Sequence, residues 1–134
     1  MDIGSSYEFT YQVQTQDLAK VLSNDPADDF PAVFATSRMI AIMELAAARL
    51  MKPCLAEGEL SVGVNVNVTH TAATLNDETV QAVATFIGME GKLYKFAVEL
   101  LDRGGSAGLG THTRAIVKTQ RLLQGAASRL DAGS

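Results

Sequence analysis

An almost uniformly apolar helix, predicted over residues 37–51, limits the folds open to this chain. It begins at Ser37, a predicted N-cap, is stopped by Pro53, and contains Glu44 as its one acidic residue. A surface helix has a polar face opposite its apolar stripe, whereas this helix is apolar on nearly every side. We therefore expect other elements to bury it, and its length of about 21 Å is far short of a bilayer span.

Segments of alternating apolar and polar residues lie on both sides of this helix and predict β-strands. They cover residues 7–14, 59–70, 79–89, 94–100 and 107–118. A phase change near Ile87 predicts a bulge, and Gly91 and Gly104-Gly105 predict hairpin turns. One strand, a long buried helix and four further strands indicate an α+β protein. The expected architecture is the hot-dog fold, in which a curved antiparallel sheet of about five strands wraps a buried helix.

Composition excludes several classes of protein. The 134 residues, with 47% hydrophobic and 19% charged, suit one globular domain, which we place at residues 1–119 with a tail at 120–134 that frays or forms a loose helix. A net charge of −4 and the lack of basic stretches argue against nucleic acid as a partner. We see no secretory signal and no membrane-spanning run. The single Cys54 excludes an internal disulfide, so the cytoplasm is the expected location.

Two polar residues stand out against apolar surroundings. Glu44 lies in the middle of the apolar helix, where an ionised carboxylate must be paired or have a raised pKa. His70 ends the valine-rich strand, on the face expected to meet the helix. Taken separately, Glu44 fits an exposed strip of the helix and His70 fits a core histidine bonded to a carbonyl. Together they form a candidate acid–base pair.

Other residues carry two open interpretations each. Thr36 is either a residue of the helix cap or a catalytic hydroxyl eight residues before Glu44. Gly63 marks either a bulge in its strand or a close approach of a ligand or another chain. His112 and Arg114 are interpreted first as surface residues, and second as part of a dimer contact or a phosphate site. Two histidines and one cysteine are too few and too scattered to predict a metal site.

Four segments resemble those of one family, the fluoroacetyl-CoA thioesterase-like group of hot-dog proteins. They are residues 30–36 (FPAVFAT), 43–44 (ME), 68–74 (VTHTAAT) and 110–115 (GTHTRA). The resemblance extends from about residue 7 to residue 118, nearly the whole domain. Each segment alone is a weak signal, whereas the combination is specific.

The resemblance implies a thioester hydrolase that acts on acyl-CoA as a homodimer or a dimer of dimers. Thr36, Glu44 and His70 match the family's catalytic Thr, Glu and His, while Gly63 and Arg114 match residues of its substrate site. By this resemblance Glu44 is the nucleophile or general base and His70 the general base or acid, with Thr36 orienting Glu44. Whether Glu44 or a water attacks the thioester stays open. Coenzyme A is part of the substrate, so no cofactor is expected.

Acyl-group specificity is a separate question from the reaction. Phe30 and Phe34, in the loop before the helix, are candidates for lining the acyl pocket. Fluoroacetyl-selective members of the family close this pocket with aromatic residues in that loop, but Ala27, Asp28 and Asp29 are not bulky and apolar. We therefore do not extend the fluoroacetyl specificity of those members to this chain. A different short or medium acyl group is at least as consistent with this loop.

Two other functions remain as alternatives. A hot-dog dehydratase or lyase would use a buried Asp/His pair and a hydratase motif, which the sequence lacks. A non-catalytic module that binds acyl-CoA or an acyl carrier would keep the tunnel without needing the catalytic groups. The presence of Thr36, Glu44 and His70 at family spacing favours the enzyme.

Overall fold

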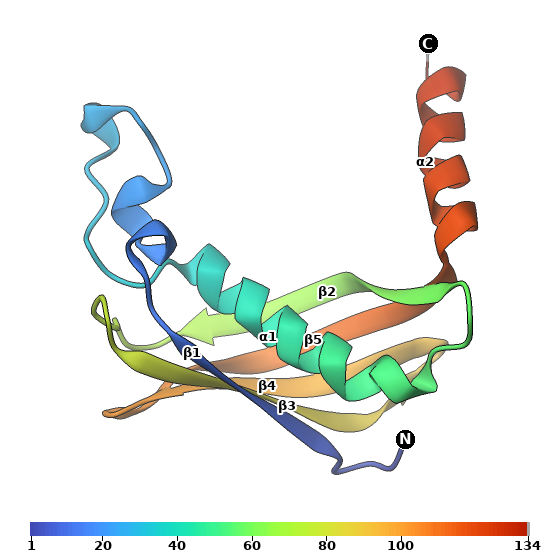
Figure 1. The fold of residues 1–134 in the computed structure, drawn as a ribbon, viewed down its shortest axis with the longest axis horizontal. Coiled ribbons are helices and arrows are strands. Elements are labelled where there is room, and N and C mark those ends of the chain that lie inside the picture. Colours follow the sequence, from blue (N-terminus) through green and yellow to red (C-terminus); the bar gives the residue numbers. More distant parts are fainter. Residues whose placement is uncertain (134) are drawn as a thin grey trace.

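The computed structural model describes residues 1–133, and in it one long helix lies across a five-stranded antiparallel sheet (Figure 1). The strand order is β1-β3-β4-β5-β2, which leaves β1 and β2 as the edges. The elements are β1 (Ser6–Gln12), α1 (Thr36–Met51), β2 (Glu59–His70), β3 (Thr79–Glu90), β4 (Leu93–Asp102), β5 (Gly105–Lys118) and α2 (Thr119–Ala132). Short 3₁₀ helices occupy Thr15–Asp17, Ala19–Val21, Pro26–Asp28 and Lys52–Cys54. The predicted α+β hot-dog fold is confirmed.

The core lies between α1 and the concave face of the sheet. Six residues of α1 are at most 4% exposed: Met39, Ile42, Met43, Ala46, Ala47 and Met51. They belong to one hydrophobic cluster with sheet residues that include Ala82, Ala84, Phe86, Phe96, Val98 and Leu100. Small alanines on both sides let the helix lie close to the strands, and burial of this apolar surface is the main force that holds it there.

The start of α1 differs from the prediction: the helix begins at Thr36 instead of Ser37, and its N-cap lies two residues earlier than expected. The N-cap is Ala35, without a side-chain cap, so the assignment of Ser37 to this position is wrong. The physical reason lies in the backbone of the preceding segment. The Ala35 N–H donates to the carbonyl of Asp17, and the Ala35 carbonyl accepts from the N–H groups of Arg38 and Met39. The N-cap at the entry to the helix is thus held by a tertiary hydrogen bond to Asp17 and by the first bonds of the helix itself, without a capping hydroxyl.

A buried carboxylate, Asp17, fixes this entry. Asp17 is fully buried and accepts hydrogen bonds from the Tyr11 hydroxyl (2.5 Å), the Gln14 N–H (2.9 Å) and Arg38 Nε (2.8 Å). Burial alone would raise the pKa of Asp17, but these hydrogen bonds outweigh it and hold the pKa below its ordinary value. Because Arg38 lies two residues after Thr36 in α1, the cluster places the first turn of the helix.

Replacing Asp17 with Ala is expected to lower the free energy of unfolding by about 3 kcal/mol, because Tyr11, Gln14 and Arg38 lose their acceptor. Urea denaturation measures this loss. Since the folded pKa of Asp17 is lowered, the stabilisation is fully present above about pH 4 and disappears as the pH falls through the folded pKa. The control is Glu78→Ala, which removes a surface ion pair with Arg103 and should cost much less. Equal losses in both variants would contradict the role of Asp17.

A bulge divides β2 into halves that turn different residues toward α1. Pairing with β5 runs from Glu59 to Gly63 and resumes at Asn65, with Val64 left out of the register. Because directly paired residues of an antiparallel sheet share a face, the register places Ser61 and Gly63 on the helix side before the bulge, and Val66, Val68 and His70 after it.

The two predictions about this strand have different outcomes. His70 lies on the helix face as expected, but Val64 does not, and its side chain is 51% exposed. The bulge between Gly63 and Asn65 breaks the alternation that the valines suggested. The bulge predicted near Ile87 is confirmed by the register shift between Phe86 and Gly88.

The C-terminal segment extends away from the sheet as α2 (Figure 1). We expected the tail either to fray or to form a loose helix, and the structure has the helix. None of its residues is buried. Among residues 1–133, no helix combines the length and the hydrophobicity required to cross a membrane.

Candidate active site

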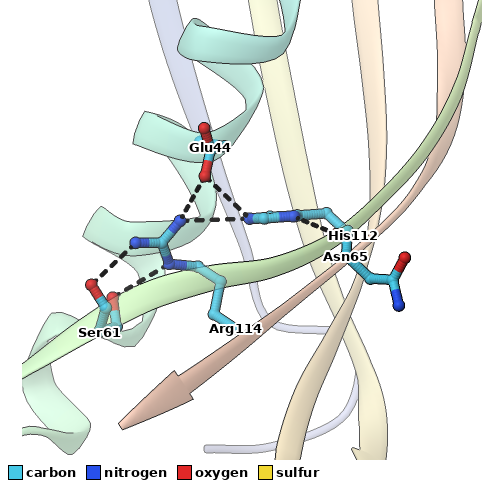
Figure 2. Close-up of polar contacts among 5 residues, drawn as sticks. All are labelled: Glu44, Ser61, Asn65, His112 and Arg114. Carbon is cyan, nitrogen blue, oxygen red and sulfur yellow. Dashed lines mark hydrogen bonds and ion pairs between the residues drawn. The ribbon is translucent and has the colours of Figure 1, made fainter. Parts of the chain in front are cut away.

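Glu44 projects from the middle of α1 toward β2 and β5 (Figure 2). Its side chain is 40% exposed, so the expected fully apolar surroundings are interrupted there. Arg114 Nη1 donates to Glu44 Oε1 over 3.2 Å. Figure 2 shows the other oxygen, Oε2, pointing away from these partners, and no hydrogen bond holds it within residues 1–133. Glu44 is therefore a paired carboxylate with one oxygen held and one available.

Arg114 is the buried cation of the site. It is 7% exposed, which makes its interpretation as a surface residue wrong. Its Nε donates to Ser61 Oγ and its Nη2 to the Ser61 carbonyl, both over 3.0 Å. Burial lowers the pKa of Arg114, while Glu44 acts in the opposite direction. An arginine remains charged under such conditions, so it supplies a fixed positive charge beside Glu44. A direct contact with substrate remains a prediction for this residue.

His112 lies beside this ion pair and is 2% exposed, so it is not a surface residue either. Its Nδ1 is 2.7 Å from the carbonyl oxygen of Asn65, and its Nε2 is 3.2 Å from Arg114 Nη1 and 4.0 Å from Glu44 Oε1. Burial is the largest influence on the pKa of His112 and lowers it, helped by Arg114 and opposed by Asn65 and Glu44. The ring is therefore held in its neutral form near neutral pH.

Position 63 requires a glycine, because the Glu44 carboxylate lies against the backbone there. A Cβ atom at this position would clash with Glu44 Oε1 and stand 3.3 Å from Cε1 of His112. Any side chain would displace the carboxylate, because the helix and the strand are both fixed by the core. Of the two interpretations offered for Gly63, the structure therefore shows a bulge next to it and a close approach by a side chain of the same protein.

A second pair of polar side chains lies at the other end of α1. Thr36 Oγ1 and His70 Nδ1 are 2.9 Å apart. Thr36 is the first residue of the helix and exposed, while His70 is partly buried at the end of β2. Partial burial lowers the pKa of His70, so its ring is neutral near neutral pH. His70 Nε2 has no hydrogen-bond partner within residues 1–133.

This pair opens onto a pocket of about 330 Å³. Its lining is mostly small and apolar: Ala19, Pro31, Val33, Phe34, Ala35, Thr71, Ala72 and Ala73, with Thr36 and His70. The two phenylalanines predicted for the acyl site differ in position. Phe34 lines the pocket and is 1% exposed, whereas Phe30 is 45% exposed and borders a separate depression of the loop.

Within one chain, Glu44 does not meet Thr36 and His70. Glu44 lies against Gly63, and His70 follows seven residues later in the same strand, roughly 20 Å along it. Thr36 precedes Glu44 by eight residues, about 12 Å along the helix axis. The three predicted residues are thus divided between two clusters. Glu44 lies in one with Arg114 and His112, and Thr36 and His70 form the other.

Sequence reasoning missed Ser61 and the structural part played by His112. One signal was present for His112: it lies two residues from Arg114 in a predicted strand, so the two side chains share one face. Ser61 had no such signal. The described residues contain no group of three or more His, Cys, Asp or Glu side chains arranged to hold a metal ion.

Comparisons with known proteins agree with this fold and identify the family. Residues 13–120 match the family of fluoroacetyl-CoA-specific thioesterases. A fluoroacetyl-CoA thioesterase of Streptantibioticus cattleyicolor is 40% identical over 94 residues, which cover 70% of this chain and 68% of that protein. The solved structure of the fluoroacetyl-CoA thioesterase FlK has a TM-score of 0.90 at 33% identity and covers 96% of both chains. A hot-dog-like protein from Thermanaerovibrio acidaminovorans, with a TM-score of 0.85 at 22% identity over 96% of this chain and 93% of that one, shares the fold.

The helix wrapped by an antiparallel sheet, together with these likenesses, defines a member of the hot-dog-fold thioesterases. Within that class the chain belongs to the fluoroacetyl-CoA-specific thioesterase family. The resemblance inferred from the four sequence segments is confirmed.

Proposed function

We propose that this protein hydrolyses acyl-CoA thioesters to the free acid and coenzyme A, and that Glu44 is its nucleophile or general base. One observation carries the proposal. The Glu44 carboxylate has Oε1 held by the buried Arg114, while Oε2 has no partner among residues 1–133 and the side chain is 40% exposed. Family membership supplies the reaction class and the acyl-CoA substrate.

Two routes fit this carboxylate. In the first, Glu44 Oε2 attacks the thioester carbonyl carbon and the C–S bond breaks. Coenzyme A then leaves with a proton, and water hydrolyses the resulting mixed anhydride. In the second, Glu44 removes a proton from a water molecule that attacks the same carbon. In both routes Thr36 and His70 orient the reacting groups and move the proton that the leaving thiol needs.

The homodimer is part of this proposal, because one chain keeps its two clusters apart. β2 is a sheet edge that carries exposed valines, with Val64 51% and Val66 38% exposed, and such an edge is suited to pairing with a second copy. An antiparallel pairing of two β2 strands brings the Gly63 half of one strand toward the His70 half of the other. Glu44 of one protomer would then complete the site with Thr36 and His70 of its partner.

Light scattering should give a mass of at least twice the 14.2 kDa of one chain. Val66→Lys should shift the protein toward monomer and reduce hydrolysis, because a lysine on the edge strand opposes pairing. The control is Ile87→Lys, at a similarly exposed residue of the interior strand β3, which should stay dimeric. A wild-type protein that is monomeric and active would contradict the shared site.

The proposed acyl group is short or medium in length and is not restricted to fluoroacetyl. The pocket beside Thr36 and His70 is lined mainly by alanine, proline and valine, with Phe34 as its one aromatic residue. Phe30 lies outside this pocket, on a loop surrounded by Asp25, Asp28 and Asp29. A small apolar lining accepts aliphatic acyl chains without selecting for fluorine. We place the enzyme in the cytoplasm, in keeping with Cys54 as a free thiol.

Release of free thiol from a panel of acyl-CoA thioesters tests the proposal. The panel contains acetyl, fluoroacetyl, butyryl, isobutyryl, hexanoyl and benzoyl thioesters. Turnover of one or more of them, and its loss in Glu44→Gln, is the expected result. If no thioester is hydrolysed although CoA raises the melting temperature, the chain is a binding module instead. Addition or loss of water in the acyl chain without thiol release would identify a lyase.

A further inference from the structure

The partners of His112 determine where its proton lies. Nδ1 is 2.7 Å from the Asn65 carbonyl oxygen, which can only accept, so Nδ1 must carry a hydrogen. Nε2 is 3.2 Å from Nη1 of Arg114, a group that can only donate, so Nε2 must be bare. The two contacts together require a neutral imidazole protonated at Nδ1.

Neighbouring elements support this state. The ring is 2% exposed and packs near Phe96 of β4, with ring centroids 6.5 Å apart. The charged groups around it are Arg114 on its own strand and Glu44 on α1, while β2 presents a backbone carbonyl. A second positive charge placed 3.2 Å from the guanidinium would be repelled, so the neutral ring suits its surroundings.

A neutral acceptor at this position completes the bonding of Arg114. Ser61 binds Nε and Nη2, which orients one side of the guanidinium. Nη1 has two N–H groups, and the structure directs one toward His112 Nε2 and the other toward Glu44 Oε1. Figure 2 shows Glu44, Arg114 and His112 converging in this way. His112 and Ser61 thereby hold the guanidinium of Arg114 in one orientation. In that orientation Nη1 holds Oε1 of Glu44 in place.

We propose that His112 is a positioning residue: as a neutral acceptor held by the Asn65 carbonyl, it orients Arg114 so that the guanidinium places the Glu44 carboxylate for thioester hydrolysis. The inference rests on the proposed function for its effect on catalysis. His112 does not contact the substrate in this scheme and acts through Arg114. The bulge at Val64 contributes to this arrangement, because it sets the register that pairs Asn65 with Thr113 and leaves the Asn65 carbonyl beside the His112 ring.

Nitrogen NMR of the histidine rings tests the hydrogen-bond assignment without any substrate. The chain contains two histidines, so comparison of untagged ¹⁵N-labelled wild type with His70→Ala assigns His112. We expect the shifts and long-range couplings of a neutral ring protonated at Nδ1 at pH 7. A ring protonated at Nε2, or an imidazolium, would overturn the inference because Nε2 could not accept from Arg114.

Kinetics test the effect on Glu44. His112→Phe keeps the volume of the ring and removes both hydrogen bonds, so kcat should fall by about 10- to 100-fold while KM changes by less than about threefold. His112→Gln can donate to Asn65 and accept from Arg114, and should recover kcat to within about threefold of wild type.

Two outcomes of the kinetics would overturn the positioning role: unchanged kcat in His112→Phe, or equal losses in the Phe and Gln variants. Absence of turnover by the wild type would instead contradict the proposed function, while the NMR result would still decide the bonding of His112.

Discussion

Replacing Glu44 with Gln is expected to reduce kcat for acyl-CoA hydrolysis by about 10³-fold or more. The amide can neither attack the thioester nor take a proton from water, so both proposed routes are blocked. It can still accept a hydrogen bond from Arg114 through its oxygen, at the site where Arg114 Nη1 now lies 3.2 Å from Glu44 Oε1. The fold and the dimer should therefore survive, and thiol-release assays measure the loss directly.

Two controls separate this effect from damage to the protein. Glu57→Gln changes the same functional group at an exposed residue outside both clusters and should leave kcat unchanged. The circular dichroism spectrum and the light-scattering mass of Glu44→Gln should equal those of wild type. A fully folded Glu44→Gln protein that retains more than about a tenth of wild-type kcat would remove Glu44 from the chemistry.

The fold was predictable because its two strongest signals are local. An apolar run between Ser37 and Pro53 needs cover, and strands with a period of two provide the sheet that buries one side of it. The expectation of burial on nearly every side is wrong for this chain, because Leu45 on the outer side is 37% exposed. The start of α1 was less predictable, since Asp17 fixes it from 18 residues before Ala35 in the sequence. No pattern close to the helix shows that a distant carboxylate and carbonyl replace the capping hydroxyl.

The sequence drew attention to Glu44 but carried no information on how the polar residues are arranged. Glu44 stood out because its residue type conflicts with its neighbours, and conflicts of this kind concentrate at functional sites. The burial of Arg114 and His112 could not be inferred, because β5 becomes an interior strand only after β2 pairs with it. The distance between Glu44 and His70 depends on where the helix crosses the sheet, and a sequence pattern carries no such information.

Replacing His70 with Ala should lower kcat by about 10²- to 10⁴-fold, the range expected for loss of a general acid or base. The physical reason is its contact with Thr36, in which His70 Nδ1 lies 2.9 Å from the hydroxyl oxygen. Burial lowers the pKa of His70, so its ring stays neutral to a lower pH than the ring of an ordinary histidine. A neutral ring can act as a base, and His70 should therefore keep this role at mildly acidic pH. Steady-state kinetics at pH 7 measure the loss, and less than a tenfold change would count against His70.

Mixed dimers then decide whether His70 and Glu44 act across the interface. Consider a heterodimer of one Glu44→Gln protomer and one His70→Ala protomer, isolated through two different affinity tags. If each site takes Glu44 from one protomer and His70 from its partner, one site contains both substitutions and the other contains neither, so about half of wild-type activity should return. If each site lay within one chain, both sites would carry one substitution and the heterodimer would stay inactive. The roughly 20 Å between Gly63 and His70 along β2 leads us to expect the first result.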